Sequence, residues 1–449
     1  MPKDTLIRET KSVCPECFRT LKADIIEIEG KVYMVKECQK HGRFQLLLSK
    51  HPWYYRELND FYFSLMSKSL PQHDYIVHLT NQCNLDCPIC LASSNRKTDA
   101  KYSHDSLRDF LKTRRNSKIN LMGAEPTMRE DLPHLIRTIK KSGNIPALHT
   151  NGIKISDFSY LDELKKAGLS EVHLQFDGFD DNVYETIRGR KLLSVKLKAL
   201  ENLERLKIST DLKATIVRGV NENQMAGVLD FAVKHSFIKE VFFLGCRFLG
   251  RAKELPIEQC IMPDELIDIL QEQTNAKISR ENVFRFQKLY YSLLDFFSVR
   301  KCFYNQHFIV TRKKEGYLPI DKTFNLQNIQ VNLETYKRLK MRNEKLAFWY
   351  LLFTLPYRLI GFKGLLWIKD FFPAAFSFMH GFSLSGLSKR ILLVGFISAC
   401  DAHSLDYQIS KNCSEGAVSA ESGARDIGAI YNIHSDNSKI PVNLEEALQ

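Results

Sequence analysis

The sequence predicts an α/β protein built on a partial (β/α)6 barrel. A small metal-binding lobe precedes the barrel, and an α-rich, lipophilic C-terminal region follows it. Three observations predict this organisation. Strand-like runs alternate with helix-like stretches from Ile76 to about Thr274, three cysteines and a histidine have metal-ligand spacing near the N-terminus, and aromatic residues are frequent after Leu346. The expected domains are residues 1–70, 71–280, 281–413 and a loop-rich tail, 414–449.

The first lobe is predicted from four metal-ligand side chains. They follow the pattern C-x2-C, twenty residues, C-x2-H, and an apparent β-hairpin around Gly30 separates the two halves. Four ligands describe a closed tetrahedral site, which suits zinc or a single iron as in rubredoxin. Four unbound side chains are disfavoured in a stretch with so little apolar core. The ligands are Cys14, Cys17, Cys38 and His41.

The barrel is predicted from six strand candidates with helix-like segments between them. Six such units make a partial α/β barrel, and the C-terminal ends of its strands form one rim. The candidates are Ile76 to Thr80, Lys118 to Met122, Ile145 to His149, Glu171 to Phe176, Leu212 to Val217 and Glu240 to Leu244.

Directly after the first strand, Cys83, Cys87 and Cys90 follow the pattern C-x3-C-x2-C. Three thiolates can hold a 4Fe-4S cluster and leave one iron open to bind a small molecule. Scattered thiols or a zinc site are weaker interpretations, because zinc loops usually combine C-x2-C with a distant second pair.

A second motif, from Gly123 to Thr127, directly follows the second strand. Together with the three cysteines it resembles the radical S-adenosylmethionine (SAM) superfamily, whose Gly-Gly-Glu-Pro motif lines the amino group of the cofactor. The resemblance implies a 4Fe-4S cluster, SAM, and cleavage of SAM to a 5'-deoxyadenosyl radical. The implied cofactor-binding residues are Cys83, Cys87, Cys90, Gly123, Ala124, Glu125 and Pro126, with the Glu125 carboxylate balancing the ammonium.

Two positions depart from the family pattern. Ala124 replaces the second glycine, which a negative φ would accommodate. Ile89 stands where many members carry an aromatic residue, so an aliphatic contact would replace stacking on adenine.

Two further rim residues, Asn151 and Asp177, follow the third and fourth strands. The family likeness implies that they and the strand after Leu212 meet the ribose and carboxylate of the cofactor. The alternative is that both residues only form turns, in which Asn and Asp are common. The sequence does not identify the residue that acts on the substrate.

The N-terminal lobe points to one branch of the radical SAM superfamily. The Cys-x-x-His-Gly knuckle, the cysteine loop and the run Glu125 to Leu132 resemble the branch that includes archaeal tetraether lipid synthase, over about Lys11 to Gln271. That resemblance implies radical coupling of lipid chains through carbon–carbon bonds. A flavodoxin or ferredoxin would serve as electron donor.

Eleven cysteines are present, and five lie outside the two motifs. Four of these could hold one auxiliary 4Fe-4S cluster. The alternative is that several are buried free thiols, which pack as small apolar side chains. The candidate ligands are Cys246, Cys302, Cys400 and Cys413, and the fifth cysteine is Cys260.

The region from Leu346 to Ser398 mixes aromatic, aliphatic and basic residues. Its uncharged tract from Leu346 to Tyr357 is too short to span a bilayer. The composition predicts an interfacial segment on anionic lipid, and the alternative is an ordinary apolar subdomain that closes the barrel. The tail after Ser414 is expected to be loop.

Composition sets the wider limits. The chain has 449 residues and is 44% hydrophobic. Its formal net charge of +12 predicts an anionic partner, such as a membrane surface or nucleic acid. An odd number of cysteines and no apolar signal after Met1 favour the reducing cytoplasm, with the protein peripheral on the inner membrane face. No nucleic-acid partner is expected.

These observations predict a radical SAM enzyme that abstracts hydrogen from a lipid chain. The alternative is a peptide- or cofactor-maturing radical SAM enzyme with an auxiliary cluster, although a compact seven-cysteine C-terminal module is missing from the sequence. A barrel kept only as a binding scaffold is disfavoured by the intact cysteines and Glu125.

Overall fold

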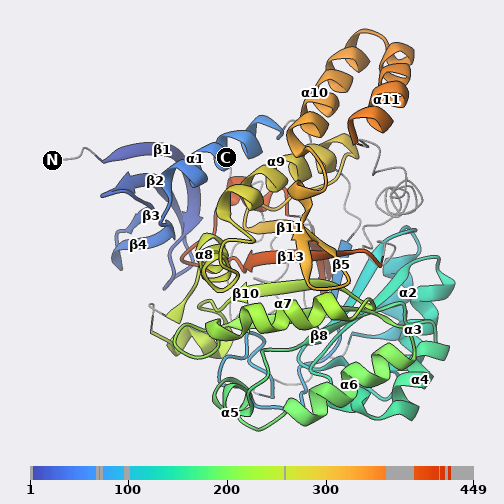
Figure 1. The fold of residues 1–449 in the computed structure, drawn as a ribbon. Coiled ribbons are helices and arrows are strands. Elements are labelled where there is room, and N and C mark those ends of the chain that lie inside the picture. Colours follow the sequence, from blue (N-terminus) through green and yellow to red (C-terminus); the bar gives the residue numbers. More distant parts are fainter. Residues whose placement is uncertain are drawn as a thin grey trace.

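A large twisted sheet forms the centre of the protein (Figure 1). The computed structural model describes residues 4–66, 70, 74–95, 102–256, 259–359, 389–413, 415–419 and 423–425. Within these ranges the large sheet has eleven strands, in the order β12-β11-β13-β10-β9-β8-β7-β6-β5-β14-β15. A separate sheet of four strands, in the order β1-β2-β3-β4, forms the N-terminal lobe.

The six predicted barrel strands are present, pair in sequence order and run parallel. The α/β fold with a partial, barrel-like sheet is therefore confirmed. Their ends shift by a few residues from the prediction, most at β9, which begins three residues earlier. The strands are β5 (Asp74–His78), β6 (Lys118–Met122), β7 (Ile145–Thr150), β8 (Glu171–Gln175), β9 (Ser209–Ile216) and β10 (Ile238–Gly245).

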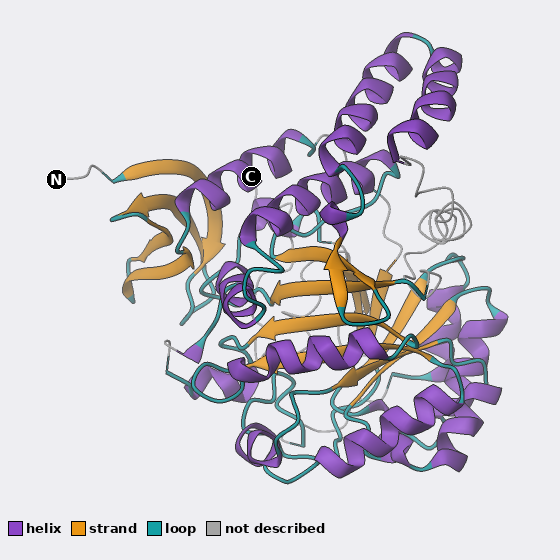
Figure 2. Cartoon of the chain, viewed as in Figure 1, coloured by secondary structure: helices purple, strands orange, loops and turns teal. Residues whose placement is uncertain are grey.

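Helices cover one face of these strands (Figure 2). Successive side chains of a strand point to opposite faces, so Val172 and Leu174 pack in the apolar core while Glu171 and His173 face the interior of the barrel. The covering helices are α2 (His104–Leu111), α3 (Leu132–Lys141), α4 (Phe158–Lys166), α5 (Asp181–Arg188), α6 (Leu193–Arg205) and α7 (Met225–Lys234).

The C-terminal third adds strands to the same sheet. β13 (Ile391–Ser398) lies parallel to β10 and antiparallel to β11 (Asn305–Arg312), which pairs with β12 (Tyr317–Pro319). The prediction that the membrane-interfacial segment runs from Leu346 to Ser398 is therefore wrong for its last residues. Ile391–Ser398 is a buried strand, with Leu392, Val394 and Phe396 in the core. The region is mixed rather than only α-rich. Its helices are α8 (Pro263–Gln273), α9 (Arg280–Phe296), α10 (Leu326–Arg342), α11 (Glu344–Leu359) and α13 (Tyr407–Ser410).

The other edge of the sheet is covered by part of the tail. β14 (Glu415–Ser419) pairs in parallel with β5, and β15 (Gly423–Arg425) pairs with β14. The prediction of a loop-rich tail is wrong for these residues, since a strand edge at β5 offers them backbone hydrogen bonds. The remainder of the tail and the segment Gly361 to Lys369 lie outside the described residues.

The N-terminal lobe packs beside the barrel. Its strands are β1 (Thr5–Val13), β2 (Thr20–Ile28), β3 (Lys31–Cys38) and β4 (Gly42–Ser49), and α1 (Pro52–Ser64) follows them. The predicted hairpin around Gly30 is confirmed, with positive φ at Glu29 and Gly30, as a tight hairpin turn requires.

Two cations, the buried Lys36 and the partly buried Arg8, join this lobe to the chain after β13. Lys36 Nζ donates to the carbonyl oxygens of Ala402 and His403, and Arg8 forms an ion pair with Asp406. The lobe is thus fixed to the segment that leaves the rim of the barrel.

Helices α10 and α11 form a hairpin that projects from the body of the protein (Figure 1). Among the described residues, no helix is both long enough and apolar enough to cross a bilayer.

Candidate active site and metal centre

The three predicted cluster ligands lie on one loop after β5. The Leu85 amide donates to Cys83 Sγ at 3.3 Å, and the Ser94 amide lies 3.4 Å from Cys90 Sγ. Asn95 closes the loop, since its Oδ1 accepts from the Cys83 amide at 2.9 Å and its Nδ2 donates to the Leu85 carbonyl at 3.2 Å. Amides that point at sulfur stabilise thiolate ligands, so the loop is preformed for iron.

The electrostatics of the loop fit thiols that ionise on binding iron. Burial raises the pKa of Cys83 to about 12 and also raises the pKa of Cys87, which the Arg188 guanidinium opposes. Such thiols ionise only when a metal supplies positive charge. A cavity of about 330 Å³, lined by Cys83, Asn84, Asp86 and Arg188 among others, lies beside the loop.

The backbone of the second motif interlocks with the entry to this loop. The Ala124 amide donates to the Thr80 carbonyl at 2.8 Å, and the Glu125 amide donates to the Gln82 carbonyl at 3.0 Å. A Cβ on Gly123, which has φ +142°, would lie 2.6 Å from Thr80 O. Glycine is therefore required at position 123, whereas Ala124 is not among the residues with positive φ and its methyl group is accommodated.

Both oxygens of the Glu125 carboxylate accept hydrogen bonds within the protein. Oε1 accepts from the Thr127 hydroxyl and the Thr150 hydroxyl, each at 2.7 Å, and Oε2 accepts from the Asn151 amide at 2.7 Å. Burial raises the pKa of Glu125, and these hydrogen bonds lower it. In this structure Glu125 joins the ends of β6 and β7, and Pro126 starts the short helix η1 (Pro126–Met128) that follows it.

Asn151 and Asp177, the two rim residues predicted from the third and fourth strands, both approach the cysteine loop. Asn151 Nδ2 donates to Asn84 Oδ1 at 2.7 Å and lies 3.8 Å from Cys83 Sγ. Asp177 is fully buried and pairs with Arg188, which also contacts Cys87. The structure thus brings all the predicted cofactor residues of the barrel to one rim. Their individual roles toward SAM stay predictions.

Sequence reasoning missed three cationic residues of this site: Arg188, Lys196 and Arg251. Lys196 is buried and donates to the Asn151 and Gln175 carbonyl oxygens, and burial lowers its pKa to about 7. Arg251 contacts Asp86 and Ser94 of the cysteine loop. The Gly-Arg pair that follows the β10 rim was an available signal for Arg251.

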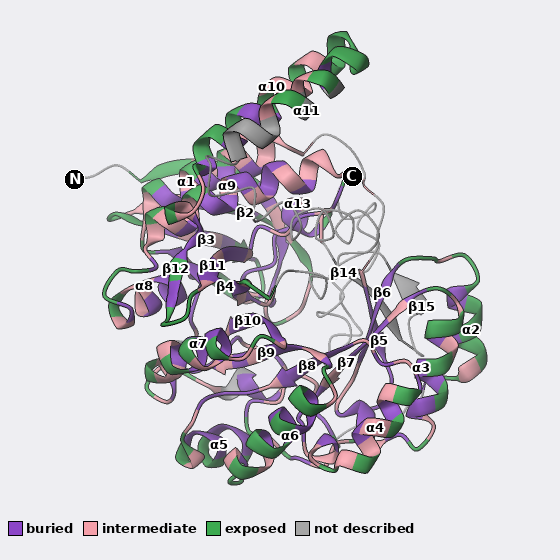
Figure 3. Ribbon diagram, turned by 45° about the vertical axis from the view of Figure 1, so that its right-hand side comes forward, coloured by how far each residue is buried: buried purple, intermediate pink, exposed green. Residues whose placement is uncertain are grey.

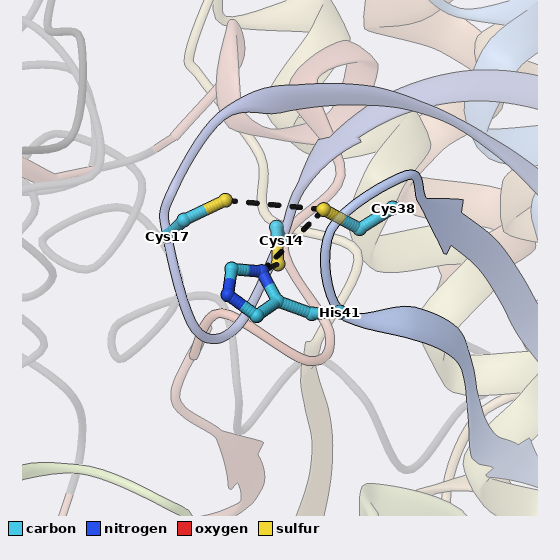
Figure 4. A group of neighbouring side chains, drawn as sticks. All are labelled: Cys14, Cys17, Cys38 and His41. Carbon is cyan, nitrogen blue, oxygen red and sulfur yellow. Dashed lines mark hydrogen bonds between the residues drawn. The ribbon is translucent and has the colours of Figure 1, made fainter.

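The N-terminal lobe holds the predicted four-ligand group (Figure 4). Ligand atoms of Cys14, Cys17, Cys38 and His41 all lie within 4.8 Å of one another, with His41 Nδ1 3.5 Å from both Cys14 Sγ and Cys38 Sγ. Although burial raises the pKa of Cys38, the amides of Lys40 and His41 lower it to about 6. A thiolate beside a compact donor set fits a tetrahedral metal.

The remaining cysteines form two groups. Register places Cys302 opposite Cys400, because Asn305 pairs with Ile397 between β11 and β13. Burial raises the pKa of Cys400, and Cys302 and Cys413 raise it further. Cys246 instead lies near Cys260. The auxiliary cluster with Cys246, Cys302, Cys400 and Cys413 as ligands stays a prediction.

The inner face of the barrel carries a buried ionic network that the sequence did not reveal. Lys118 forms an ion pair with Glu171, and His173 lies 2.9 Å from both Glu171 and Asp211. His149 stacks on His173 with ring centroids 4.1 Å apart. The inner face of the barrel at these strands is therefore polar and buried.

Comparison with known proteins agrees with this geometry. Residues 77–232 match the model of the radical SAM superfamily, and residues 6–50 match that of the HMPTM N-terminal zinc ribbon domain. Residues 77–232 therefore form a radical SAM domain, whose cofactors are a 4Fe-4S cluster and SAM, and the N-terminal lobe is a metal-binding one.

Among curated proteins, the chain is similar to 7,8-dihydro-6-hydroxymethylpterin dimethyltransferase of Methanocaldococcus jannaschii. The two are 32% identical over 309 residues, which cover 62% of this chain and 61% of that protein. It is also similar to a probable GTP 3',8-cyclase of Pyrococcus abyssi, 27% identical over 37% of this chain and 54% of that protein. The matches thus span less than two thirds of either relative, and neither bears on tetraether lipid synthase.

Among solved structures, Streptococcus suis SuiB bound to precursor peptide SuiA aligns with a TM-score of 0.40 and 13% identity. The alignment covers 62% of this chain and 71% of that one. A match at this level supports no inference about this protein.

Proposed function

We propose that this radical SAM enzyme removes a hydrogen atom from a lipid chain, for carbon–carbon coupling or another change to that chain. The observation that carries the proposal is the surface of the projecting α10–α11 hairpin. It combines exposed apolar side chains with a cluster of basic residues.

The apolar side chains form a stripe on α11. Leu346, Trp349 and Phe353 are 53%, 52% and 70% exposed, and their spacing of three and four residues places them on one helix face. Met341, at the end of α10, is 82% exposed. Exposed apolar stripes of this kind are typical of helices that lie in the membrane interface.

Basic residues surround this stripe. Arg338, Lys340, Arg342 and Lys345 are exposed near the tip of the hairpin, and Glu344 is the acidic residue among them. Figure 3 shows that much of the α10–α11 hairpin is exposed. Each such cation adds about 1 kcal/mol of attraction to an anionic membrane surface. The hairpin therefore suits an anionic bilayer, where lipid substrates are found. A cytoplasmic enzyme, peripheral on the inner face of the membrane, is part of this proposal.

The bound cluster and SAM supply a radical strong enough to remove hydrogen from an unactivated carbon. The residues of this chain prepare the rim for that step. Glu125 fixes the ends of β6 and β7, and the buried Asp177–Arg188 pair holds the strand ends behind the cysteine loop. The electron donor in this proposal is a flavodoxin or ferredoxin.

Vesicle binding tests the proposal. The double variant Trp349→Ser, Phe353→Ser should no longer co-sediment with phosphatidylglycerol vesicles, whereas the wild type should. Leu197→Ser is the matched control, because Leu197 is an exposed apolar residue on α6, 40% exposed. Equal sedimentation of the double variant and the wild type would refute the interfacial hairpin.

The alternative, a peptide- or cofactor-maturing enzyme, has its own observation. The ionic inner face built from Lys118, Glu171, His173 and Asp211 suits a polar molecule better than a hydrocarbon chain. One relative is named for methylation of a reduced pterin. If 6-hydroxymethyl-7,8-dihydropterin raises formation of 5'-deoxyadenosine and lipid does not, this alternative replaces the lipid proposal.

A further inference from the structure

We propose that Arg251 is a positioning residue for the cluster, one that holds the cysteine loop in its ligand geometry and raises the reduction potential of the bound iron. The inference rests on the cluster assignment to Cys83, Cys87 and Cys90. It is independent of the lipid substrate.

The backbone before Arg251 fits against the last cysteine. Gly250 has φ +55°, and a Cβ there would lie 2.3 Å from the Cys90 carbonyl oxygen and 2.4 Å from that of Leu91. The Arg251 amide donates to the same Cys90 carbonyl at 2.9 Å. The segment after β10 can approach this closely only because position 250 is glycine.

The side chain of Arg251 then spans the cysteine loop. Its Nη1 donates to Asp86 Oδ1, just before Cys87, and its Nη2 donates to Ser94 Oγ at 2.9 Å and to the Ser94 carbonyl at 3.2 Å. A planar guanidinium can hold two points at fixed separation, which a lysine cannot do. One side chain thus fixes the loop on both sides of its last two cysteines.

Ser94, which Arg251 holds, in turn contacts the sulfur atom of Cys90. Its amide and its hydroxyl each lie 3.4 Å from Cys90 Sγ. Partners of ligand residues orient the ligands and commonly change metal affinity by about 10–100-fold. Arg251 itself is 8% exposed, so its positive charge stays close to the cluster ligands. A nearby buried cation favours the reduced, more negative cluster.

Chelator competition and redox titration of the reconstituted protein test this role. Arg251→Gln should release cluster iron to a chelator with an affinity about tenfold or more below the wild type. Its midpoint potential should shift to more negative values. Arg251→Lys should restore the potential but not iron retention, since lysine keeps the charge and loses the two-point contact.

Two further variants keep the test decisive. Asp86→Asn keeps Arg251 but removes the charge of its partner. Because the Asp86 side chain is 71% exposed, this variant should fold normally, yet it should retain iron less well than the wild type. Arg218→Gln is the control, because it removes a partly exposed guanidinium that pairs with Glu265 instead. Wild-type iron retention in both Arg251→Gln and Asp86→Asn would overturn the proposal, as would an equal loss in Arg218→Gln.

Discussion

Asp177 and Arg188 form a buried, two-point ion pair at the rim of the barrel. Arg188 Nε lies 2.8 Å from Asp177 Oδ2, and Nη2 lies 2.9 Å from Oδ1. Oδ1 also accepts from the Thr215 amide at 3.0 Å, so the pair joins the ends of β8 and β9. Since Arg188 also contacts Cys87, the ion pair connects the barrel to the cysteine loop.

We therefore expect Asp177→Asn to destabilise the protein by about 3–5 kcal/mol, because it leaves a buried guanidinium without its charge partner. Urea unfolding measures the change. Asp105→Asn is the control, as it breaks an exposed Asp–Arg pair on α2 and should leave the unfolding midpoint unchanged. A midpoint for Asp177→Asn equal to that of the wild type would contradict the structural role of the pair.

Gly123→Ala should weaken both folding and cluster binding. The new methyl group would meet Thr80 O at 2.6 Å with φ at +142°, a conformation that non-glycine residues rarely adopt. Thermal unfolding and iron content after reconstitution would show the loss. The same change at Gly227, on α7, meets only Phe179 at 3.9 Å and should be tolerated. Similar behaviour of the two variants would argue against the close contact at Gly123.

Cys87→Ala should abolish SAM cleavage and leave the fold intact. Two cysteines cannot hold the cluster in place of three, while the deleted sulfur contributes little to the core. Circular dichroism and formation of 5'-deoxyadenosine are the measurements. Cys260→Ala removes a cysteine outside the loop and should retain cleavage. If Cys87→Ala still cleaves SAM, the cluster ligands are assigned wrongly.

The N-terminal lobe should lose its metal and its stability in Cys17→Ala. Elemental analysis should show one metal equivalent less per chain. The lobe contributes Arg8 and Lys36 to contacts with the segment after β13, so the unfolding temperature should fall as well. A variant with full metal content would contradict the four-ligand site.

The same lobe should respond to acid. The pKa of Cys38 is lowered from its ordinary value of 9.0 to about 6, so the folded lobe favours the thiolate. The stability from this ionisation is complete above pH 9 and is lost as the pH falls through about 6. Release of metal, followed with a chromogenic chelator, should therefore rise below about pH 6. Release that does not depend on pH would contradict a thiolate ligand.

Local patterns allowed much of the fold to be predicted. Strand β6 has the predicted bounds, and Cys83, Cys87 and Cys90 lie on a loop after β5 as expected, because periodicity and spacing report on neighbouring residues. The entry of β13 into the sheet could not be predicted. An apolar run such as Ile391–Ser398 has the same composition in a core strand and in a membrane segment, and only long-range pairing distinguishes the two.

Only part of the candidate site could be predicted, because some of its residues are defined by contacts between distant parts of the chain. Cys83, Glu125 and Asn151 stand in motifs or at strand ends, so a single sequence indicates them. Arg251 and Lys196 act on residues 165 and 45 positions away, at Asp86 and Asn151, and no local pattern indicates such contacts.

The most direct test of the central claim is 5'-deoxyadenosine formed from SAM by the anaerobically reconstituted, reduced protein, with and without deuterium-labelled lipid from its source cell. We expect lipid to stimulate its formation and deuterium to appear in it. No 5'-deoxyadenosine from protein with an intact cluster would contradict the radical SAM site, and formation that lipid neither stimulates nor labels would contradict the lipid substrate.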